Sequence, residues 1–461
     1  MPINSFLYPA KHVPVAYEVA NSLRFDDGSS DYLSQTFSGA GNQRTFTISF
    51  WFKRSNLVSG NVYTYQGEGN EIRSEFIFFN DYLKIVFNPT GSAWSSDMII
   101  QNNGSNILFK DVSAWYHVVL AIDTTQSTEA NRIKPYVNGV LQSMSAYPSQ
   151  NFDTGYNTAI EHGIGTYIHA TNTFFDGYFA EFCVVDGSQL DATSFGEFDS
   201  DTNIWKPIDV SGLTFGTNGF YLDFENSSSL GADVSGNGNN FTVNNLTSID
   251  QSTDTCTNNF ATLNLEYAGL NANFSLSEGN LKGLNTGNGE NNYVSTIGVS
   301  SGKWYFEAKA NVAGDNYATI GIVATDSLLQ VNGSWLGSTS DSYFYNENGG
   351  IGTNGSASTT GLASYTDNDI IGVRVNLDDN ELHFYKNGTI ITNTALSITA
   401  NKEYFFGGRV YSNATGWEFN FGSPPYSISS GNSDANGYGN FEYSVPSGYY
   451  ALCTKNLAEY G

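Results

Sequence analysis

One stretch, residues 369–389, restricts the fold more than any other part of the chain. It carries apolar residues at alternate positions: Ile371, Val373, Val375 and Leu377, then Leu382 and Phe384. Because side chains alternate between the two faces of a strand, each run places its apolar residues on one face. The intervening Asp378-Asp379-Asn380 has the composition of a turn. The stretch therefore predicts two β-strands joined by a turn.

A tyrosine followed two positions later by Asn-Gly occurs once in each half of the chain. The two copies are Tyr136-Val137-Asn138-Gly139 and Tyr385-Lys386-Asn387-Gly388. Asn-Gly is the strongest short signal for a tight β-hairpin. A chain of 461 residues is too long for one hydrophobic core. We therefore predict an all-β fold of two jelly-roll-like antiparallel sandwiches in tandem, joined by a packed connector.

The composition agrees with this fold and restricts the partners. Aromatic residues make up 15% and charged residues 14%, and the 48 glycines suit short strands joined by tight turns. The formal net charge of −26 repels phosphate backbones and anionic lipid, so we expect neither nucleic acid nor membrane insertion. The first residues lack a signal-peptide pattern, and no run reaches the roughly 18 apolar residues of a membrane-spanning helix.

Three widely spaced cysteines, Cys183, Cys256 and Cys453, fit neither a disulfide framework nor a zinc cluster. They are typical of a chain made in a reducing cytoplasm. We expect no cofactor, except that calcium remains an open alternative.

Changes in pattern divide the chain into four segments. Residues 1–20 have no clear period and are expected to form an N-terminal arm. Residues 21–195 and 263–461 carry the two sets of strands. Residues 196–262 are rich in turns but also in aromatic residues, so we expect a rigid connector packed against the first sandwich or in the joint.

Residues 20–195 resemble a laminin-G-like, concanavalin A-like jelly roll. The residues that carry the resemblance are Leu23-x-Phe25-Asp26 with Tyr32, the strand from Thr45 to Phe52, Trp115-Tyr116-His117-Val118, Tyr136-Val137-Asn138-Gly139, and Asp176-Gly177-Tyr178-x-Ala180-Glu181. The family's last strand usually reads Gly-x-Ile-Asp-Glu, and the Asp is absent here. No metal or sugar role is therefore carried over to that position.

Residues 265–455 resemble a SPRY domain more strongly. The matching motifs are Gly302-Lys303-Trp304-Tyr305-Phe306-Glu307, Gly321-Ile322, Asp369-Ile370-Ile371-Gly372-Val373, Phe384-Tyr385-Lys386-Asn387-Gly388, and Asn420-Phe421-Gly422. The tandem, with its connector motif from Gly216 to Phe224, resembles virion proteins of tailed bacteriophages. In that group the pair occurs in tail-fibre-like or capsid-decorating chains.

Candidates for catalysis are few. A retaining glycosidase needs two carboxylates about 5 Å apart, and the nearest pairs are Glu71 with Glu75 and Asp223 with Glu225. Solvated surface acids are the simpler reading of both. His162 and His169 could face one loop together, as a metal or general-base site or as loop histidines that bond the backbone. We therefore expect no enzyme.

Binding residues are the stronger candidates. Asp26, Asp27 and Asp31 cluster in one loop and could hold calcium, as in several laminin-G-like domains, or could only shape the turn. In the predicted loop 332–348, Trp335, Tyr343 and Tyr345 stand among Gly, Ser and Asn. Rigid aromatics in adaptable polar surroundings are typical of recognition surfaces. The SPRY resemblance also places a partner-binding surface there, although the rings could instead pack under their own loop or against a neighbouring subunit.

The first hypothesis is a non-enzymatic phage virion protein, a tail-fibre or capsid-decoration subunit that attaches to host-surface glycan or protein. It would be made in the host cytoplasm, contact other virion proteins and form a homo-oligomer. The alternatives are a glycan-cleaving depolymerase and a purely structural virion subunit without a ligand.

Overall fold

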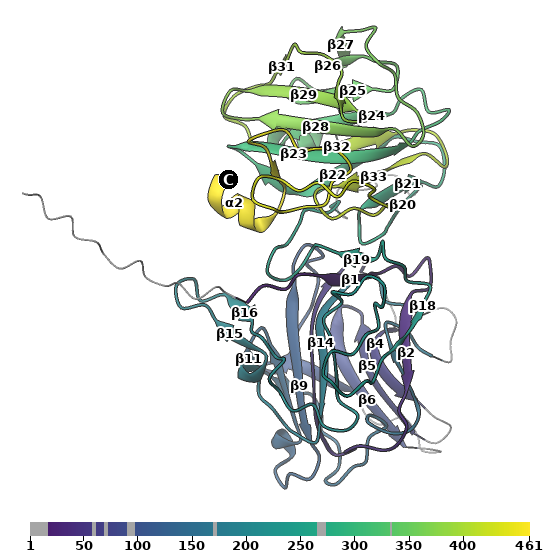
Figure 1. Cartoon of the computed structure of the whole chain (residues 1–461), viewed down its shortest axis with the longest axis vertical. Coiled ribbons are helices and arrows are strands. Elements are labelled where there is room, and N and C mark those ends of the chain that lie inside the picture. The colour runs from purple at the N-terminus through teal and green to yellow at the C-terminus, as the bar shows by residue number, and fades with distance from the viewer. Residues whose placement is uncertain are drawn as a thin grey trace, which may run out of the picture.

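The structure is a computed structural model of the chain, and it describes residues 17–57, 61–68, 72–89, 97–168, 173–264, 273–331 and 334–461. Figure 1 shows two β-sandwiches stacked along the long axis, with the N-terminal one below. Helix within these ranges comprises α1 (Thr325–Val331), α2 (Thr454–Tyr460) and the 3-10 turns η1 (Glu129–Asn131) and η2 (Ala192–Ser194). The predicted all-β tandem is confirmed. None of these described helices has the length and apolar character needed to cross a membrane.

The first sandwich consists of two antiparallel sheets. The strands of one sheet are β1 (Ser22–Phe25), β3 (Thr45–Arg54), β9 (Tyr116–Asp123), β10 (Ile133–Val137), β11 (Val140–Leu141), β14 (Gly177–Asp186), β17 (Phe220–Leu222) and β19 (Gln251–Ser252). Their order is β11-β10-β9-β3-β14-β1-β19, with β17 also paired to β14. The strands of the other sheet are β2 (Tyr32–Thr36), β4 (Asn61–Glu68), β5 (Ile72–Phe79), β6 (Tyr82–Pro89), β7 (Met98–Asn102), β8 (Ser105–Asn106), β12 (Ser143–Met144), β13 (Glu161–Ile164) and β18 (Thr242–Asn244). Their order is β12-β7-β6-β5-β4-β13-β2-β18, with β8 on β7.

Strand β3 shows why this sheet is buried on both faces. Phe46, Ile48, Phe50 and Phe52 alternate into the core between the sheets, as the sequence predicted. Trp51, on the opposite face, is buried by a second cluster that includes Phe195 and, from the connector that follows it, Trp205 and Phe215. The residues that continue the chain past the first sandwich therefore cover its outer surface.

The connector is part of the first sandwich rather than a separate linker. It forms a two-stranded sheet of β15 (Gly196–Phe198) and β16 (Trp205–Pro207). It then adds β17 to β14, β18 to β2 and β19 to β1. This agrees with the expectation of a packed connector, and each added strand extends one of the two sheets.

Trp205 holds the connector in place. Its indole lies over the turn between β10 and β11, where Asn138 and Gly139 have φ angles of 46° and 78°. A Cβ on Gly139 would stand 2.2 Å from the indole, so both the close approach and the backbone angle require glycine. The indole N–H donates to Nδ1 of His117 at 2.9 Å. Nε2 of His117 therefore carries the proton that it shares with Ser49 Oγ, also at 2.9 Å.

The second sandwich also has two sheets. The strands of one are β20 (Phe274–Ser277), β21 (Lys282–Asn285), β23 (Lys303–Asn311), β28 (Ile370–Asn376), β29 (Glu381–Lys386), β30 (Thr389–Ile390), β31 (Leu396–Ser397), β33 (Gly416–Asn420) and β34 (Tyr450–Ala451). Their order is β20-β21-β33-β23-β28-β29-β30, with β31 on β29 and β34 on β23. The other sheet is formed by β22 (Asn291–Val299), β24 (Thr319–Ala324), β25 (Ser342–Asn346), β26 (Ile351–Thr353), β27 (Ser356–Thr359) and β32 (Tyr404–Val410). Their order is β22-β32-β24-β25-β26-β27.

The hairpin predicted over residues 369–389 is β28 paired with β29, and β29 then turns into β30. Ile371, Val373 and Val375 lie in the core. Asn387 and Gly388 have φ angles of 47° and 75° in the two-residue turn between β29 and β30. The Tyr443 ring covers this turn, since a Cβ on Gly388 would stand 2.5 Å from it. Both Asn-Gly turns are thus covered by an aromatic side chain from later in the chain.

A buried ion pair lies where the two sandwiches meet. Lys53, at the end of β3, donates to Oδ2 of Asp254 at 2.8 Å, and both side chains are 1% exposed. The other carboxylate oxygen accepts from the Trp115 indole at 3.0 Å and the Phe260 amide at 3.3 Å. Lys53 also donates to Oδ1 of Asn259 at 2.7 Å. These bonds tie the first sandwich to residues 254–260, which lead into the second.

Direct contacts between the sandwiches surround this ion pair. The Tyr178 hydroxyl donates to the Gly279 carbonyl at 2.9 Å, and the Asn280 amide donates to the Ser55 carbonyl at 2.6 Å. Buried Arg24 donates to the Pro424 carbonyl at 3.1 Å and pairs with Glu278 at 3.2 Å. These contacts form a polar junction between the two sandwiches, and the rigidity of that junction stays a prediction.

We predict that Asp254→Asn lowers the free energy of unfolding by about 3–5 kcal/mol, because it leaves the Lys53 ammonium buried without a carboxylate. Adding Lys53→Met to that variant should recover part of the loss. Asp153→Asn is the control, since it breaks the exposed Arg44–Asp153 pair and should leave stability nearly unchanged. Urea titrations followed by tryptophan fluorescence measure all three. Equal losses for Asp254→Asn and Asp153→Asn would contradict the role of the buried pair.

A second prediction concerns pH. Burial lowers the pKa of His117 to about 3, whereas an unfolded histidine titrates near 6.5. The neutral ring therefore stabilises the fold above about pH 6.5, and this contribution is lost as the pH falls toward 3. The stability difference between the wild type and His117→Gln should shrink by up to about 1.4 kcal/mol per pH unit between about pH 6 and 4. Urea titrations at several pH values measure it, and parallel curves for the two proteins would refute this account.

Candidate functional site

The aspartates considered for calcium form a turn. Oδ1 of Asp26 accepts from the Gly28 amide at 3.0 Å, and the Asp26 amide donates to Oδ2 of Asp31 at 3.0 Å. Asp31 is buried, and burial raises its pKa to about 6. Among the described residues, no group of three or more His, Cys, Asp or Glu side chains is arranged to hold a metal ion. These contacts explain the aspartates as turn-forming residues, and calcium binding there stays a prediction.

The side chain of Asp27 lies near that of Asp176, which directly precedes β14 in the chain. The Asn56 amide group donates to Oδ2 of Asp27 at 3.3 Å and to Oδ2 of Asp176 at 2.8 Å. Burial, and then the neighbouring Asp27 charge, raise the pKa of Asp176 well above its ordinary value. An amide donor therefore occupies the space between these two carboxyl groups that a cation would need.

The catalytic candidates are not arranged for chemistry where the structure describes them. Glu75 is buried on β5 and pairs with Arg73 at 3.0 Å. Asp223 accepts from the Glu225 amide at 3.1 Å in an exposed turn. Glu71 lies outside the described residues. Glu75 is thus engaged by an arginine, and Asp223 by the amide of its own turn.

Of the two histidines considered for a metal or general-base site, only His162 lies within the described residues. His162 is buried on β13, and its Nδ1 donates to the Ile160 carbonyl at 2.9 Å. Burial lowers the pKa of His162 to about 4. This is the expected behaviour of a structural histidine that bonds the backbone. His169 lies outside the described residues.

The prediction that residues 332–348 form a loop is wrong for the second half of this range. Residues Ser342–Asn346 form β25, which pairs with β24 and β26 inside the sheet. The Tyr343 and Tyr345 side chains are 4% and 0% exposed, and both belong to the core. Tyr343 bonds Thr399, and the Tyr345 hydroxyl donates to the Ala363 carbonyl. As placed, neither ring can stack on a ligand at the surface, because residues 342–346 alternate as a strand rather than projecting as a loop.

Trp335 lies in the irregular segment before β25 and is half-buried. Its ring packs edge-on against Phe344, with centroids 5.3 Å apart. The segment is anchored by Asn292, which accepts from the Leu336 amide at 2.8 Å and donates to the Ser334 carbonyl at 2.9 Å. Both neighbours of Trp335 are therefore held to β22, which fixes the position of the ring.

Three aromatic side chains and one arginine gather at this edge of the second sandwich. We call them the aromatic platform: Tyr317, Trp335, Arg409 and Tyr411. Tyr317 precedes β24 and Tyr411 follows β32, and they are 53% and 38% exposed. Their ring centroids lie 5.2 Å apart. The Arg409 guanidinium lies 4.7 Å from the Trp335 ring and 5.5 Å from the Tyr317 ring.

Hydrogen bonds fix the geometry of the platform. Arg409 pairs with both carboxylate oxygens of Glu290 at 2.5 Å, and it donates to the Tyr317 carbonyl at 2.8 Å. Asp315 accepts from the Tyr411 amide at 2.6 Å and from the Tyr317 amide at 2.9 Å. The platform is therefore preformed, and its one cation is neutralised by Glu290.

The sequence reasoning found only Trp335 of these four residues. Tyr317 and Tyr411 are far apart in the chain and come together because β24 pairs with β32, with Thr319 opposite Arg409. The available signal was a tyrosine within two residues of an asparagine at each strand end, as in Asp315-Asn316-Tyr317 and Tyr411-Ser412-Asn413. That signal needs the strand pairing before it identifies a shared surface.

Comparison with family models finds one match within each sandwich. Residues 27–192 match the concanavalin A-like lectin/glucanases superfamily, and residues 303–424 match the SPRY domain. The chain matches no curated protein sequence.

Solved structures that are similar include the SPRY domain of human HERC1, with 19% identity over 34% of this chain and 96% of that one, and a TM-score of 0.28. The TRIM65 PSpry domain has 15% identity over 35% of this chain and 91% of that one. A heptameric SAP-like pentraxin from Limulus polyphemus has 15% identity over 38% and 80%. Both also have TM-scores of 0.28, and similarities this weak carry no argument about function.

With both sandwiches matched in chain order, this chain contains a concanavalin A-like domain followed by a SPRY domain.

Proposed function

We propose that this chain is a non-enzymatic subunit of a tailed-bacteriophage virion, in a tail fibre or a capsid decoration. In this proposal it attaches the particle to host-surface glycan or protein. The virion assignment rests on the resemblance of the tandem and its connector to phage proteins. The attachment role rests on one observation, the exposed and preformed aromatic platform of the second sandwich.

The platform has the physical properties of a recognition surface. Exposed tyrosines present a large apolar face with a hydroxyl at its edge, which suits both sugar rings and protein side chains. Asp315 and Asn292 already hold the backbone that carries the aromatic residues, and Glu290 holds the guanidinium. Binding therefore requires little ordering of this backbone, which favours affinity.

The charge of the chain also restricts the ligand. With a net charge of −26 and with Arg409 paired to Glu290, the platform offers no free cation to an anionic polymer. A neutral glycan or a neutral to basic protein surface is the better partner. The same net charge keeps a large homo-oligomer of such subunits soluble.

The depolymerase alternative has less support, because Glu75 is buried in its pair with Arg73. The purely structural alternative requires the aromatic platform to be buried against other virion proteins or against another copy of the chain.

We predict that Tyr317→Ala and Tyr411→Ala each weaken retention of the protein on host cells about tenfold, because each removes one stacking face. Tyr411→Phe should retain most of the binding. Phe198→Ala is the matched control, since Phe198 is an exposed aromatic residue on the other sandwich. The measurement is the fraction of labelled protein bound to cells across a concentration series. Undiminished retention of both alanine variants would refute the role of the platform.

The same incubation tests the enzyme alternative. We expect no release of reducing ends from host-surface polysaccharide, because Glu75 is buried and paired with Arg73 rather than free to act as one of two catalytic carboxylates. Release that Glu75→Gln abolishes would instead establish a glycan-cleaving enzyme. If the cells do not retain the protein and no reducing ends are released, the attachment role is overturned and the purely structural alternative remains.

A further inference from the structure

A lysine, an asparagine and an aspartate meet in the interior of the junction between the sandwiches. Nζ of Lys53 lies 2.7 Å from Oδ1 of Asn259 and 2.8 Å from Oδ2 of Asp254. Because a carbonyl bond is about 1.23 Å long, Nζ also lies within about 4 Å of Cγ, the carboxamide carbon of Asn259. The lysine nitrogen therefore has beside it both an amide carbon that it can attack and a carboxylate that can take its proton.

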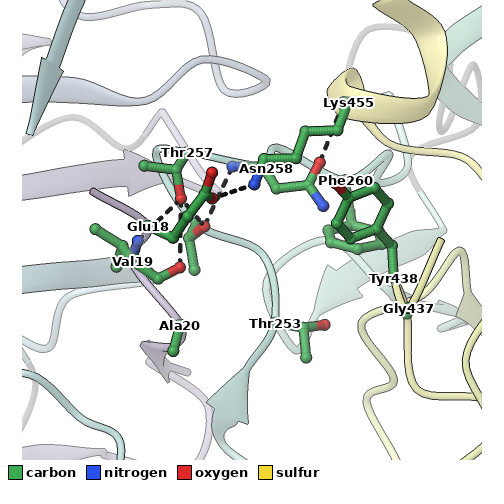
Figure 2. Close-up of a pocket in the computed structure, with 12 residues that line it drawn as sticks. Glu18, Val19, Ala20, Thr253, Thr257, Asn258, Phe260, Gly437, Tyr438 and Lys455 are labelled. Carbon is green, nitrogen blue, oxygen red and sulfur yellow. Dashed lines mark hydrogen bonds and ion pairs between the residues drawn. The ribbon is translucent and has the colours of Figure 1, made fainter. Parts of the chain in front are cut away.

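Asn259 is held so that its carbonyl faces the lysine. Its Nδ2 donates to the Ser113 carbonyl at 2.8 Å, which leaves Oδ1 as the atom directed at Nζ. Its backbone amide donates to Oγ1 of Thr454 at 3.0 Å, and its backbone carbonyl accepts from the Thr454 amide at 2.9 Å. Figure 2 shows the next residue, Phe260, and Lys455 of the same helix, α2, where they line one recess. Bonds to the first sandwich and to α2 thus fix the carboxamide.

The surroundings of the three groups favour a reaction between them over hydrolysis. The Lys53 and Asp254 side chains are each 1% exposed, so water has little access to them. The Tyr178 ring lies 5.7 Å from Nζ, and the Trp115 indole donates to the other carboxylate oxygen of Asp254 at 3.0 Å. Burial penalises both charges of the ion pair, and transfer of a proton from Nζ to Oδ2 removes both at once. That transfer converts the ammonium into a neutral amine, which is the nucleophilic form.

We propose that Lys53 and Asn259 join in an intramolecular isopeptide bond, with Asp254 as the proton acceptor. The neutral amine attacks Cγ of Asn259, so that the Nζ–Cγ bond forms and the Cγ–Nδ2 bond breaks. Of the two protons that Nζ gives up, one remains on Asp254 and the other passes to Nδ2, which leaves as ammonia. No oxidant or cofactor is needed, and the products are neutral. The fixed contact makes the reaction intramolecular, which lowers its entropic cost.

The bond would make the junction covalent. It would join the end of β3 in the first sandwich to the segment that leads into the second, and so constrain the unfolded chain as a disulfide does. The structure shows the three groups before the bond forms, while Lys53 and Asp254 are an ion pair. The proposal does not involve the aromatic platform, so it is independent of the attachment role.

The chain offers a matched set of groups that should not react. Lys386 pairs with Asp369 at 3.0 Å, and Nδ2 of Asn387 donates to the same carboxylate at 2.8 Å. The Lys386 side chain is 29% exposed, however, so water solvates its ammonium. Oδ1 of Asn387 accepts from the Ile370 amide at 2.9 Å. The same three residue types therefore occur here without the burial and without the carbonyl directed at the lysine.

The test is mass spectrometry of the full chain under denaturing conditions, after prolonged incubation of the folded protein at neutral pH. The wild type should be lighter than its sequence by one ammonia, and peptide mapping should find a branched peptide that joins Lys53 to Asn259. Trypsin should no longer cleave after Lys53. The variants Lys53→Met, Asn259→Ala and Asp254→Asn should each keep the full mass. Lys386→Met is the matched control and should lose ammonia as the wild type does.

The wild type alone can overturn the proposal, because a full mass and no branched peptide after incubation would show that the bond does not form. A loss of ammonia that persists in Lys53→Met would come from cyclisation of an asparagine elsewhere, as at an Asn-Gly turn, and would also overturn it. A branched peptide in Asp254→Asn would overturn the role of Asp254 as proton acceptor. Circular dichroism checks that each variant is folded, and the branched peptide of the wild type decides the case even where a variant is not.

Discussion

The ion pair between Lys53 and Asp254 is the constraint on which the relation of the two sandwiches depends. A buried charge costs several kcal/mol unless it is paired and fully hydrogen-bonded. Here the ammonium and carboxylate bond each other, and Trp115, Asn259 and Phe260 complete the set. Lys53 lies at the end of a core strand and Asp254 at the entrance to the second sandwich. The pair is therefore satisfied in the arrangement of the two sandwiches that the structure shows, and other arrangements would have to break it.

The sequence predicted much of the fold because the signals concerned are local. Alternation in β3 and β28 and the two Asn-Gly turns depend on neighbours within a few residues, and the structure confirms them. What covers those elements depends on distant residues. Sequence motifs and their spacing could not predict the contacts of Trp205 with Gly139 and of Tyr443 with Gly388. Each contact joins segments separated by more than 50 positions.

The candidate sites were harder to predict for the same reason. Tyr343 and Tyr345 stand among polar residues, a composition typical of a loop, yet pairing with β24 and β26 draws them into the core. Aromatic composition alone does not distinguish a buried strand from an exposed surface. The aromatic platform is created by the pairing of β24 with β32, which brings together residues from distant parts of the chain. Only Trp335 among its residues had a signal strong enough to be singled out.

The attachment of Tyr17–Ala20 has a mechanical consequence. The Tyr17 hydroxyl bonds Glu181 at the β-bulge of β14, Glu18 pairs with Lys455 of the second sandwich, and Val19 bonds Thr257 between them. Immediately afterwards the chain enters β1, which is hydrogen-bonded on both sides, to β14 and to β19. A pulling force applied through the residues before Tyr17 would thus be divided between both sandwiches and would load the bonds of β1 together. Tension on that end would have to break these contacts with both sandwiches before it reached β1.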